Sequence, residues 1–171
     1  MGPLHLPSGI LTPDYKRNGT TTLFAALDLI EGTVIGECHA RHRHQEFLAF
    51  LRRLDRTYPP ELELHLIVDS YGTHTHPEVV KWLAAPARAR FHLHFTPTSS
   101  SWLNLVERWF RELTDKRIRR GDFRSVADLV GAIHADIALG NANRKPFVWT
   151  APVEAILAKV GRCRAILETV H

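Results

Sequence analysis

The stretch "LELHLIVDSYGTHTHPEVVKWLAA", residues 62–85, joins a predicted strand to a predicted helix through a turn. Its apolar run Leu66-Ile67-Val68 is continuous, which is typical of a parallel strand buried on both faces. Pro77 stands where the first turn of a helix accepts proline, because that turn needs no backbone donor there. This strand-turn-helix unit predicts an α/β fold and places Asp69 at the end of the strand.

The segments on both sides extend the α/β pattern. Residues 20–30 and 33–40 are β-branched and apolar and flank a Glu31-Gly32 turn, so they predict a hairpin. The other expected elements are a helix over 42–60, a strand over 90–98, and helices over about 102–119, 125–139 and 152–168. A hairpin followed by alternating helices and strands predicts a mixed sheet with flanking helices.

Composition is that of an ordinary soluble domain. The 171 residues are 44% hydrophobic and 23% charged, enough for one domain with a core. No apolar run approaches the roughly 20 residues of a membrane span, and the N-terminus lacks the pattern of a secretory signal. Cys38 and Cys163 have no CxxC context and are expected to be free thiols. These features predict a cytoplasmic protein with no membrane partner.

Basic side chains gather in one segment. The chain carries a formal charge of +4 and 11 histidines, which favours polyanions weakly. Between residues 108 and 124 there are seven basic side chains against three acids. The candidates for DNA contacts are Arg108, Arg111, Lys116, Arg117, Arg119 and Arg120. A solvated helix face with no ligand is the alternative interpretation.

Two carboxylates are candidates for a metal site. Ligands gather at the carboxyl ends of neighbouring parallel strands, where Asp69 is expected. Glu107 lies on the helix after the 90–98 strand, at the edge of an apolar stripe made of Leu103, Val106, Phe110 and Leu113. Converging carboxylates form the all-oxygen site that Mg²⁺ or Mn²⁺ prefers. The alternatives are a turn-forming role for Asp69 and an ion pair of Glu107 with Arg108 or Arg111.

Other motifs favour structural roles. His74 and His76 have a spacing that can ligate zinc, but capping or phosphate contacts are favoured because nothing completes a tetrahedral set. Ser99 to Ser101 suit helix capping better than nucleophilic catalysis. Trp102 and Trp109 could stack on bases, yet their helical spacing favours the core.

Four long stretches carry a family resemblance. They are "TTTLFAALDLIEGTVIGECHARHRHQEFLAFL", "LIVDSYGTHTHPEVVKWL", "FHLHFTPTSSSWLNLVERWFRELT" and "RGDFRSVADLVGAI…NANRKPFVWT". From about Asp14 onward the chain resembles the DDE endonuclease domain of bacterial insertion-sequence transposases, in the branch related to the mariner transposons. The resemblance implies a ribonuclease H-like fold, two Mg²⁺ (or Mn²⁺) ions, and cutting and joining of DNA at transposon ends. It also implies that Asp69 and Glu107 are the second and third catalytic, metal-binding acids, with Asn104 as a possible contributor.

The chain departs from the family at its start. The family's first catalytic aspartate lies on the first strand, in a "VDE"-like segment, whereas residues 1–13 hold no acid and predict an irregular leader. We therefore expect residues 14–171 to form a catalytic domain that lacks the first strand and first aspartate and is impaired. A homodimer or a separately encoded N-terminal transposase part is the expected partner beside DNA. The alternatives are an inactive remnant that binds DNA or a partner transposase chain, and a stand-alone ribonuclease H-like nuclease.

Overall fold

The computed structural model describes residues 19–96 and 105–145. The elements in chain order are β1 (Thr22–Leu27), β2 (Val34–His39), α1 (His44–Thr57), β3 (Leu64–Val68), α2 (Pro77–Leu83), a 3₁₀ turn (Pro86–Arg88), β4 (Phe91–Phe95), α3 (Leu105–Leu113), a π-helical turn (Thr114–Ile118) and α4 (Val126–Ala142). This order confirms the predicted α/β class. No described helix is both long and apolar enough to cross a membrane.

The described strands form two separate sheets of two strands each. β1 and β2 pair antiparallel, from Thr22 opposite His39 to Leu27 opposite Val34. β3 and β4 pair parallel, from Leu64 opposite Phe91 to Val68 opposite Phe95. The predicted hairpin and the predicted parallel strand are thus confirmed. The single mixed sheet is not seen among residues 19–96 and 105–145, because no described strand joins β1 or β2 to β3 or β4.

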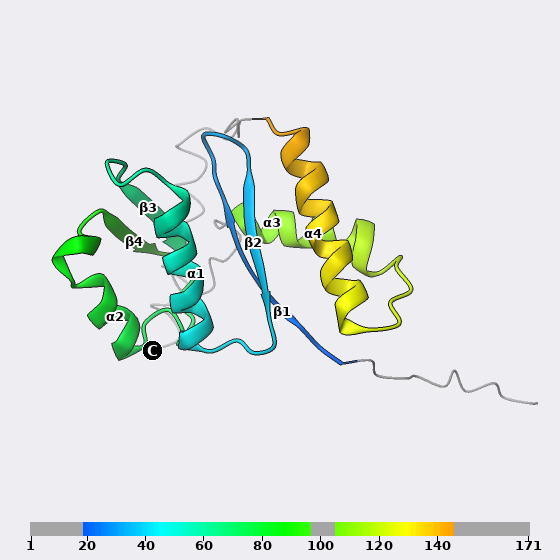
Figure 1. Cartoon of the computed structure of the whole chain (residues 1–171), viewed down its shortest axis with the longest axis horizontal. Helices are drawn as coiled ribbons and strands as arrows, with labels where there is room; N and C mark the ends of the chain where they lie inside the picture. Colours follow the sequence, from blue (N-terminus) through cyan, green and yellow to red (C-terminus); the bar gives the residue numbers. More distant parts are fainter. Residues whose placement is uncertain (1–18, 97–104, 146–171) are drawn as a thin grey trace, which may run out of the picture.

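The hairpin has helices on both faces (Figure 1). Alternation along the strands turns Phe24 toward α1, while Val34 turns toward α3 and α4. Gly36 lies so close to Ile137 of α4 that a Cβ atom there would stand 2.5 Å from the isoleucine Cδ1. The turn needs Gly32, whose φ of +70° suits glycine.

Helix α1 supplies the core that the two sheets share. Apolar residues spaced for a helix place Phe47, Leu51 and Leu54 on one face, and Leu51 is fully buried. The same cluster includes Phe24 from β1 and Leu64 from β3. The helix ends at Thr57, shortly before Pro59-Pro60 as predicted. α1 therefore holds the two small sheets together.

One prediction for β3 is wrong. The strand was expected to be buried on both faces, but Ile67 is 52% exposed. Side chains on one face, such as Leu64, pack on α1 and α2, whereas His65, Ile67 and His94 share the other, exposed face. No described helix covers that face, so an apolar sequence run did not mean burial there.

The C-terminal helices begin and end near the predicted residues. The helix expected over 102–119 is α3 followed by a π-helical turn, in which the Arg119 N–H donates to the Thr114 carbonyl at 2.9 Å. α4 starts after Ser125, whose hydroxyl accepts from the Asp128 N–H, and it extends to Ala142 rather than 139. Ser99 to Ser101, Trp102, Leu103 and the helix expected over 152–168 lie outside the described residues.

Polar side chains also tie each sheet to a helix. Arg90, just before β4, donates to the carboxylate and carbonyl of Asp55 in α1 at 3.0 and 2.7 Å, and also to the carbonyls of Pro59 and Tyr58. On the hairpin side, the Asn141 amide of α4 accepts from the Val34 N–H at 2.8 Å and donates to the Val34 carbonyl at 2.9 Å. These contacts satisfy backbone groups that the ladders leave unpaired.

Candidate metal and DNA-binding site

Asp69 follows the last residue of β3, at the carboxyl end of the parallel pair, as predicted. Its side chain is 41% exposed. The Oδ1 atom accepts from the Tyr71 N–H at 3.3 Å, which is the turn-forming contact expected of an aspartate after a strand. Oδ1 also lies 2.8 Å from Nδ1 of His74. Both contacts of the Asp69 carboxylate within the turn therefore involve Oδ1.

His42, in the loop between β2 and α1, lies near this end of the sheet. The His42 ring stacks on Phe24 with centroids 4.5 Å apart and meets Tyr71 edge-on at 5.2 Å. Burial lowers the pKa of His42 below its usual range, and the nearby His74 acts in the same direction, while Asp69 opposes the shift. The site is thus bordered by aromatic rings on the side of β1 and α1.

His44, the first residue of α1, and His76, just before α2, bring the starts of these two helices together. The His76 ring accepts from the Glu78 N–H at 3.3 Å and caps α2, which confirms the predicted capping role. It also stacks on His44 with ring centroids 3.5 Å apart. Within residues 19–96 and 105–145, no group of three histidine, cysteine or acidic side chains is arranged to hold a metal ion, which gives the zinc interpretation no support.

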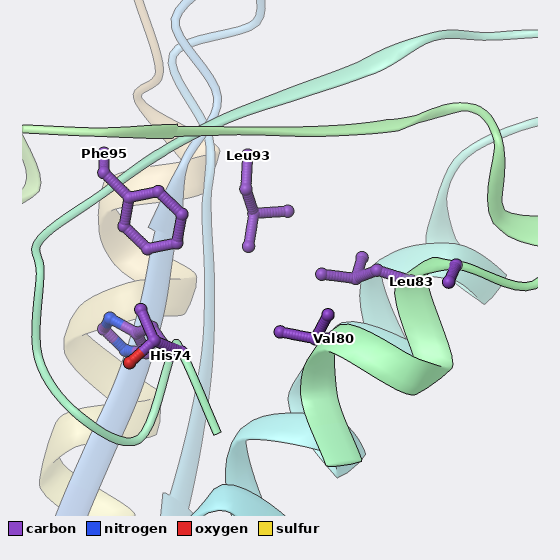
Figure 2. Close-up of a pocket in the computed structure, with 7 residues that line it drawn as sticks. His74, Val80, Leu83, Leu93 and Phe95 are labelled. Atoms are coloured by element: carbon purple, nitrogen blue, oxygen red, sulfur yellow. The ribbon is translucent and has the colours of Figure 1, made fainter. Parts of the chain in front are cut away.

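An apolar hollow of about 380 Å³ opens beside Asp69, between β4 and α2. Figure 2 shows Leu93 and Phe95 of β4 on one side of it, Val80 and Leu83 of α2 on another, and His74 in the loop below Phe95. Phe95 and Val80 are 45% and 55% exposed. The lining is almost entirely apolar, so the hollow offers few groups for orienting a polar ligand.

Glu107 lies in the first turn of α3 and is exposed. None of the described salt bridges includes it, so the predicted alternative of a pair with Arg108 or Arg111 gains no support. Arg108 instead pairs with Glu112 at 3.4 Å. α3 packs its other face on the hairpin through Trp109 and Leu113, which confirms that Trp109 belongs to the core. No described contact joins Glu107 to Asp69, and Asn104 lies outside the described residues.

The basic segment is partly neutralised by its own acids. Lys116 and Arg108 both pair with Glu112. Both lower the pKa of the Glu112 carboxyl below its usual range, and the hydrogen bond from Lys116 has the larger effect. Further ion pairs join Arg117 to Asp136 at 2.6 Å and Arg119 to Asp115 at 3.0 Å. Arg111 and Arg120 are exposed and have no salt bridge in the described part of the chain.

The donors that remain suit a hard cation. Asp69 keeps a carboxylate oxygen, Oδ2, that takes part in no described hydrogen bond, and Glu107 keeps its whole carboxylate. Mg²⁺ and Mn²⁺ prefer such oxygen ligands, whereas zinc sites favour nitrogen and sulfur. The residues therefore fit a divalent oxygen-ligated ion.

Sequence reasoning did not single out three partners at this site. The stacking of His42 on Phe24 and the packing of His74 on Phe47 link residues remote in the chain, whereas the contact of His74 with Asp69 lies within one turn. The His74 link had one signal, a histidine five residues after an aspartate across a glycine-containing turn.

A comparison with protein families identifies the chain. A family described as DDE superfamily endonuclease matches residues 10–130, which spans both Asp69 and Glu107. The chain belongs to this family. Its members generally use divalent metal ions, in agreement with the oxygen donors left free at the end of β3. The match confirms the resemblance to DDE endonucleases found in the sequence.

One relative of the chain is a protein of an insertion element. The chain is 33% identical over 84 residues to a protein described as "Insertion element IS630 uncharacterized 39 kDa protein" from Shigella sonnei. The alignment covers 49% of the chain and 24% of that relative. The chain thus matches about a quarter of the relative's length.

Proposed function

We propose that this DDE endonuclease domain is the catalytic part of an insertion-sequence transposase, which cleaves DNA at transposon ends and joins it to a target. The observation that supports this most is Asp69, at the end of a parallel strand with one carboxylate oxygen uncommitted, within the matched family segment. The relative from an insertion element favours transposition over a stand-alone nuclease.

Asp69 and Glu107 are the proposed metal ligands, with Asn104 as a possible contributor. When bound, Mg²⁺ or Mn²⁺, as two ions in a complete site, supplies Lewis acidity and charge neutralisation at the scissile phosphate. The chain's own contribution is to hold the carboxylates at the strand end and to leave that end accessible, since Asp69 is 41% exposed.

We also propose a ribonuclease H-like sheet, completed by a strand between β1 and β3. The support is that β1 pairs only with β2, and β3 only with β4, in the described strands, while Phe24 and Leu64 share one core. Open strand edges are sites for pairing with a further strand. In this proposal the added strand brings the third carboxylate that a complete two-metal site needs.

DNA is held by the basic segment, and its ion pairs divide the residues into two groups. Arg111 and Arg120 have no described acidic partner, so we propose that they contact phosphates first. Arg108, Lys116, Arg117 and Arg119 must give up an acidic partner to do so. Arg111→Gln should lower the salt slope of DNA binding by about 1, and Arg108→Gln should lower it less.

Nicking of supercoiled plasmid DNA in Mn²⁺ tests the catalytic proposal. The chain is compared with a version extended by the coding sequence upstream, each beside Asp69→Asn and Glu107→Gln. We expect weak nicking by the 171 residues, robust nicking by the extended version, and loss of both in either variant. Equal nicking by the two versions would refute the impairment, and nicking that survives both substitutions would refute the site.

The second candidate is a chain that binds DNA or a partner transposase without cutting. The observation that favours it is that the described residues bring no group of three acidic or histidine ligands together. Salt-dependent DNA binding with no nicking by either version would support this candidate over the first.

A further inference from the structure

We propose that His74 is a positioning residue that holds Asp69 by one oxygen, so that only Oδ2 is presented to a metal ion. The inference rests on the proposed function, because it takes Asp69 to be a metal ligand. It assigns His74 a role that acts through its contact with Asp69.

The contacts of Asp69 divide its two oxygens. Nδ1 of His74 lies 2.8 Å from Oδ1 and 3.1 Å from the Asp69 carbonyl oxygen. The Asp69 carbonyl oxygen can only accept a hydrogen bond, so Nδ1 carries the hydrogen and donates. With the Tyr71 N–H at 3.3 Å, Oδ1 receives two donors, whereas no described group donates to Oδ2.

His74 is itself fixed by its surroundings. Its side chain is only 13% exposed, against 41% for Asp69. The ring packs on Phe47 of α1 with centroids 4.3 Å apart, and Phe47 is 4% exposed in the shared core. The His74 N–H donates to the Tyr71 carbonyl at 2.9 Å, which closes the turn between the two partners. The core therefore fixes the position of the His74 ring, and the ring fixes the orientation of the Asp69 carboxylate.

The two hydrogen bonds to Oδ1 restrict rotation of the Asp69 carboxylate. An unrestrained Asp69 could rotate and offer either oxygen, or both, to a cation. Hydrogen bonds to the non-ligating atoms of a metal ligand orient it, and their loss typically lowers metal affinity about 10- to 100-fold. Because Phe47 belongs to the core that α1 shares with β1 and β3, the metal ligand is positioned relative to both sheets.

Mn²⁺ binding, followed by the electron paramagnetic resonance signal of the free ion, tests the proposal without requiring catalysis. His74→Phe keeps a ring on Phe47 and removes the donor, and His74→Asn offers an amide N–H near the position of Nδ1. We expect His74→Phe to weaken Mn²⁺ binding about 10- to 100-fold and His74→Asn to restore it to within about threefold. The matched control is His65→Phe, an exposed histidine of β3, the strand that ends just before Asp69.

Two further measurements separate positioning from folding and from the site assignment. Thermal unfolding should change little in His74→Phe, and nitrogen chemical shifts of the wild-type His74 imidazole should show a protonated Nδ1. Mn²⁺ binding by His74→Phe within twofold of wild type, with Asp69→Asn defective, would overturn the positioning role alone. No binding by the wild type, or unchanged binding by Asp69→Asn, would overturn the metal site and the inference with it.

Discussion

The two small sheets differ in how they are covered. β1–β2 has α1 on one face and α3 with α4 on the other, whereas β3–β4 has α1 and α2 on one face and exposed His65, Ile67 and His94 on the other (Figure 1). The hairpin therefore has both faces packed against helices and leaves little surface for a ligand. The parallel pair carries Asp69, and no element within residues 19–96 and 105–145 pairs with its outer edge or covers its second face, which are features that a binding surface needs.

The difference also shows what the shared helix does. α1 contributes to the core beneath both sheets, and its Phe47 contacts the His74 ring that meets Asp69. A change in α1 should thus reach the candidate site, whereas a change on the exposed face of β3 should not.

The largest effect is expected from a matched pair of cavity substitutions. Leu51→Ala empties a fully buried position beneath both sheets and should lower the free energy of unfolding by about 2–5 kcal/mol. Ile67→Ala removes a 52% exposed side chain of β3 and should cost less than about 1 kcal/mol. Urea unfolding of both variants gives the comparison. Equal losses would mean that the exposed face of β3 is covered in solution.

Two glycines provide the next contrast, between the hairpin turn and the loop after Asp69. Gly32 has φ +70°, and an added Cβ would lie 1.9 Å from the Lys145 carbonyl oxygen, so Gly32→Ala should cost about 2–3 kcal/mol. Gly72 has no atom within 4 Å of an added Cβ, and Gly72→Ala should be neutral or stabilise by up to about 1 kcal/mol. Thermal unfolding measures both. A costly Gly72→Ala would show that the loop is as tightly packed as the hairpin.

The two polar ties to the helices should rank next. Arg90→Ala leaves the Asp55 carboxylate, 18% exposed, without its closest partner and should cost about 2–3 kcal/mol. Asn141→Ala leaves the Val34 N–H and carbonyl without their amide partner and should cost about 1–2 kcal/mol. Asn143→Ala, which removes a bond to the Leu139 carbonyl near the helix end, is the control for Asn141. A larger loss in Asn141→Ala than in Arg90→Ala would reverse the proposed order.

Much of the fold could be predicted from the sequence because its signals are local. The Glu31-Gly32 turn, Pro77 at the start of α2 and Ser125 before α4 each act through their own neighbours. The strand-end position of Asp69 followed from the same local reading. The prediction that was wrong, burial of β3 on both faces, depends on elements distant in the sequence. Ile67 belongs to an apolar run, yet no described helix covers it.

The candidate site shows the same division. Residue type and position selected Asp69 and Glu107, and the family match spans both. Their being metal ligands remains a prediction, as do the DNA contacts of the basic segment. The ion pairs within that segment could be guessed from four-residue spacings, such as Arg108 with Glu112, but Arg117 with Asp136 joins two elements and could not.

The smallest effect is a pH dependence at the start of α1, the helix that serves both sheets. Glu46 accepts from the Arg43 backbone N–H at 3.1 Å and from its guanidinium at 2.6 Å, and the guanidinium lowers the pKa of Glu46 to about 2. A carboxyl whose pKa is lower in the folded state stabilises the fold above its unfolded pKa of 4.5 and loses that contribution as the pH falls toward about 2. The wild type should therefore lose melting temperature between about pH 4.5 and 2, and Glu46→Gln should lose less in that window.

Glu112→Gln provides the comparison on the hairpin side, because the pKa of Glu112 is lowered as well, mainly by Lys116. Glu112 is 47% exposed, and Arg43, the partner of Glu46, is 49% exposed, so salt should weaken both effects. Glu46, however, lies one residue before Phe47, whose ring supports His74. If the start of α1 positions the metal ligand, Glu46→Gln should weaken Mn²⁺ binding slightly near neutral pH, and Glu112→Gln should leave it unchanged. Equal Mn²⁺ affinities in both variants would confine the effect of the Glu46 contact to stability.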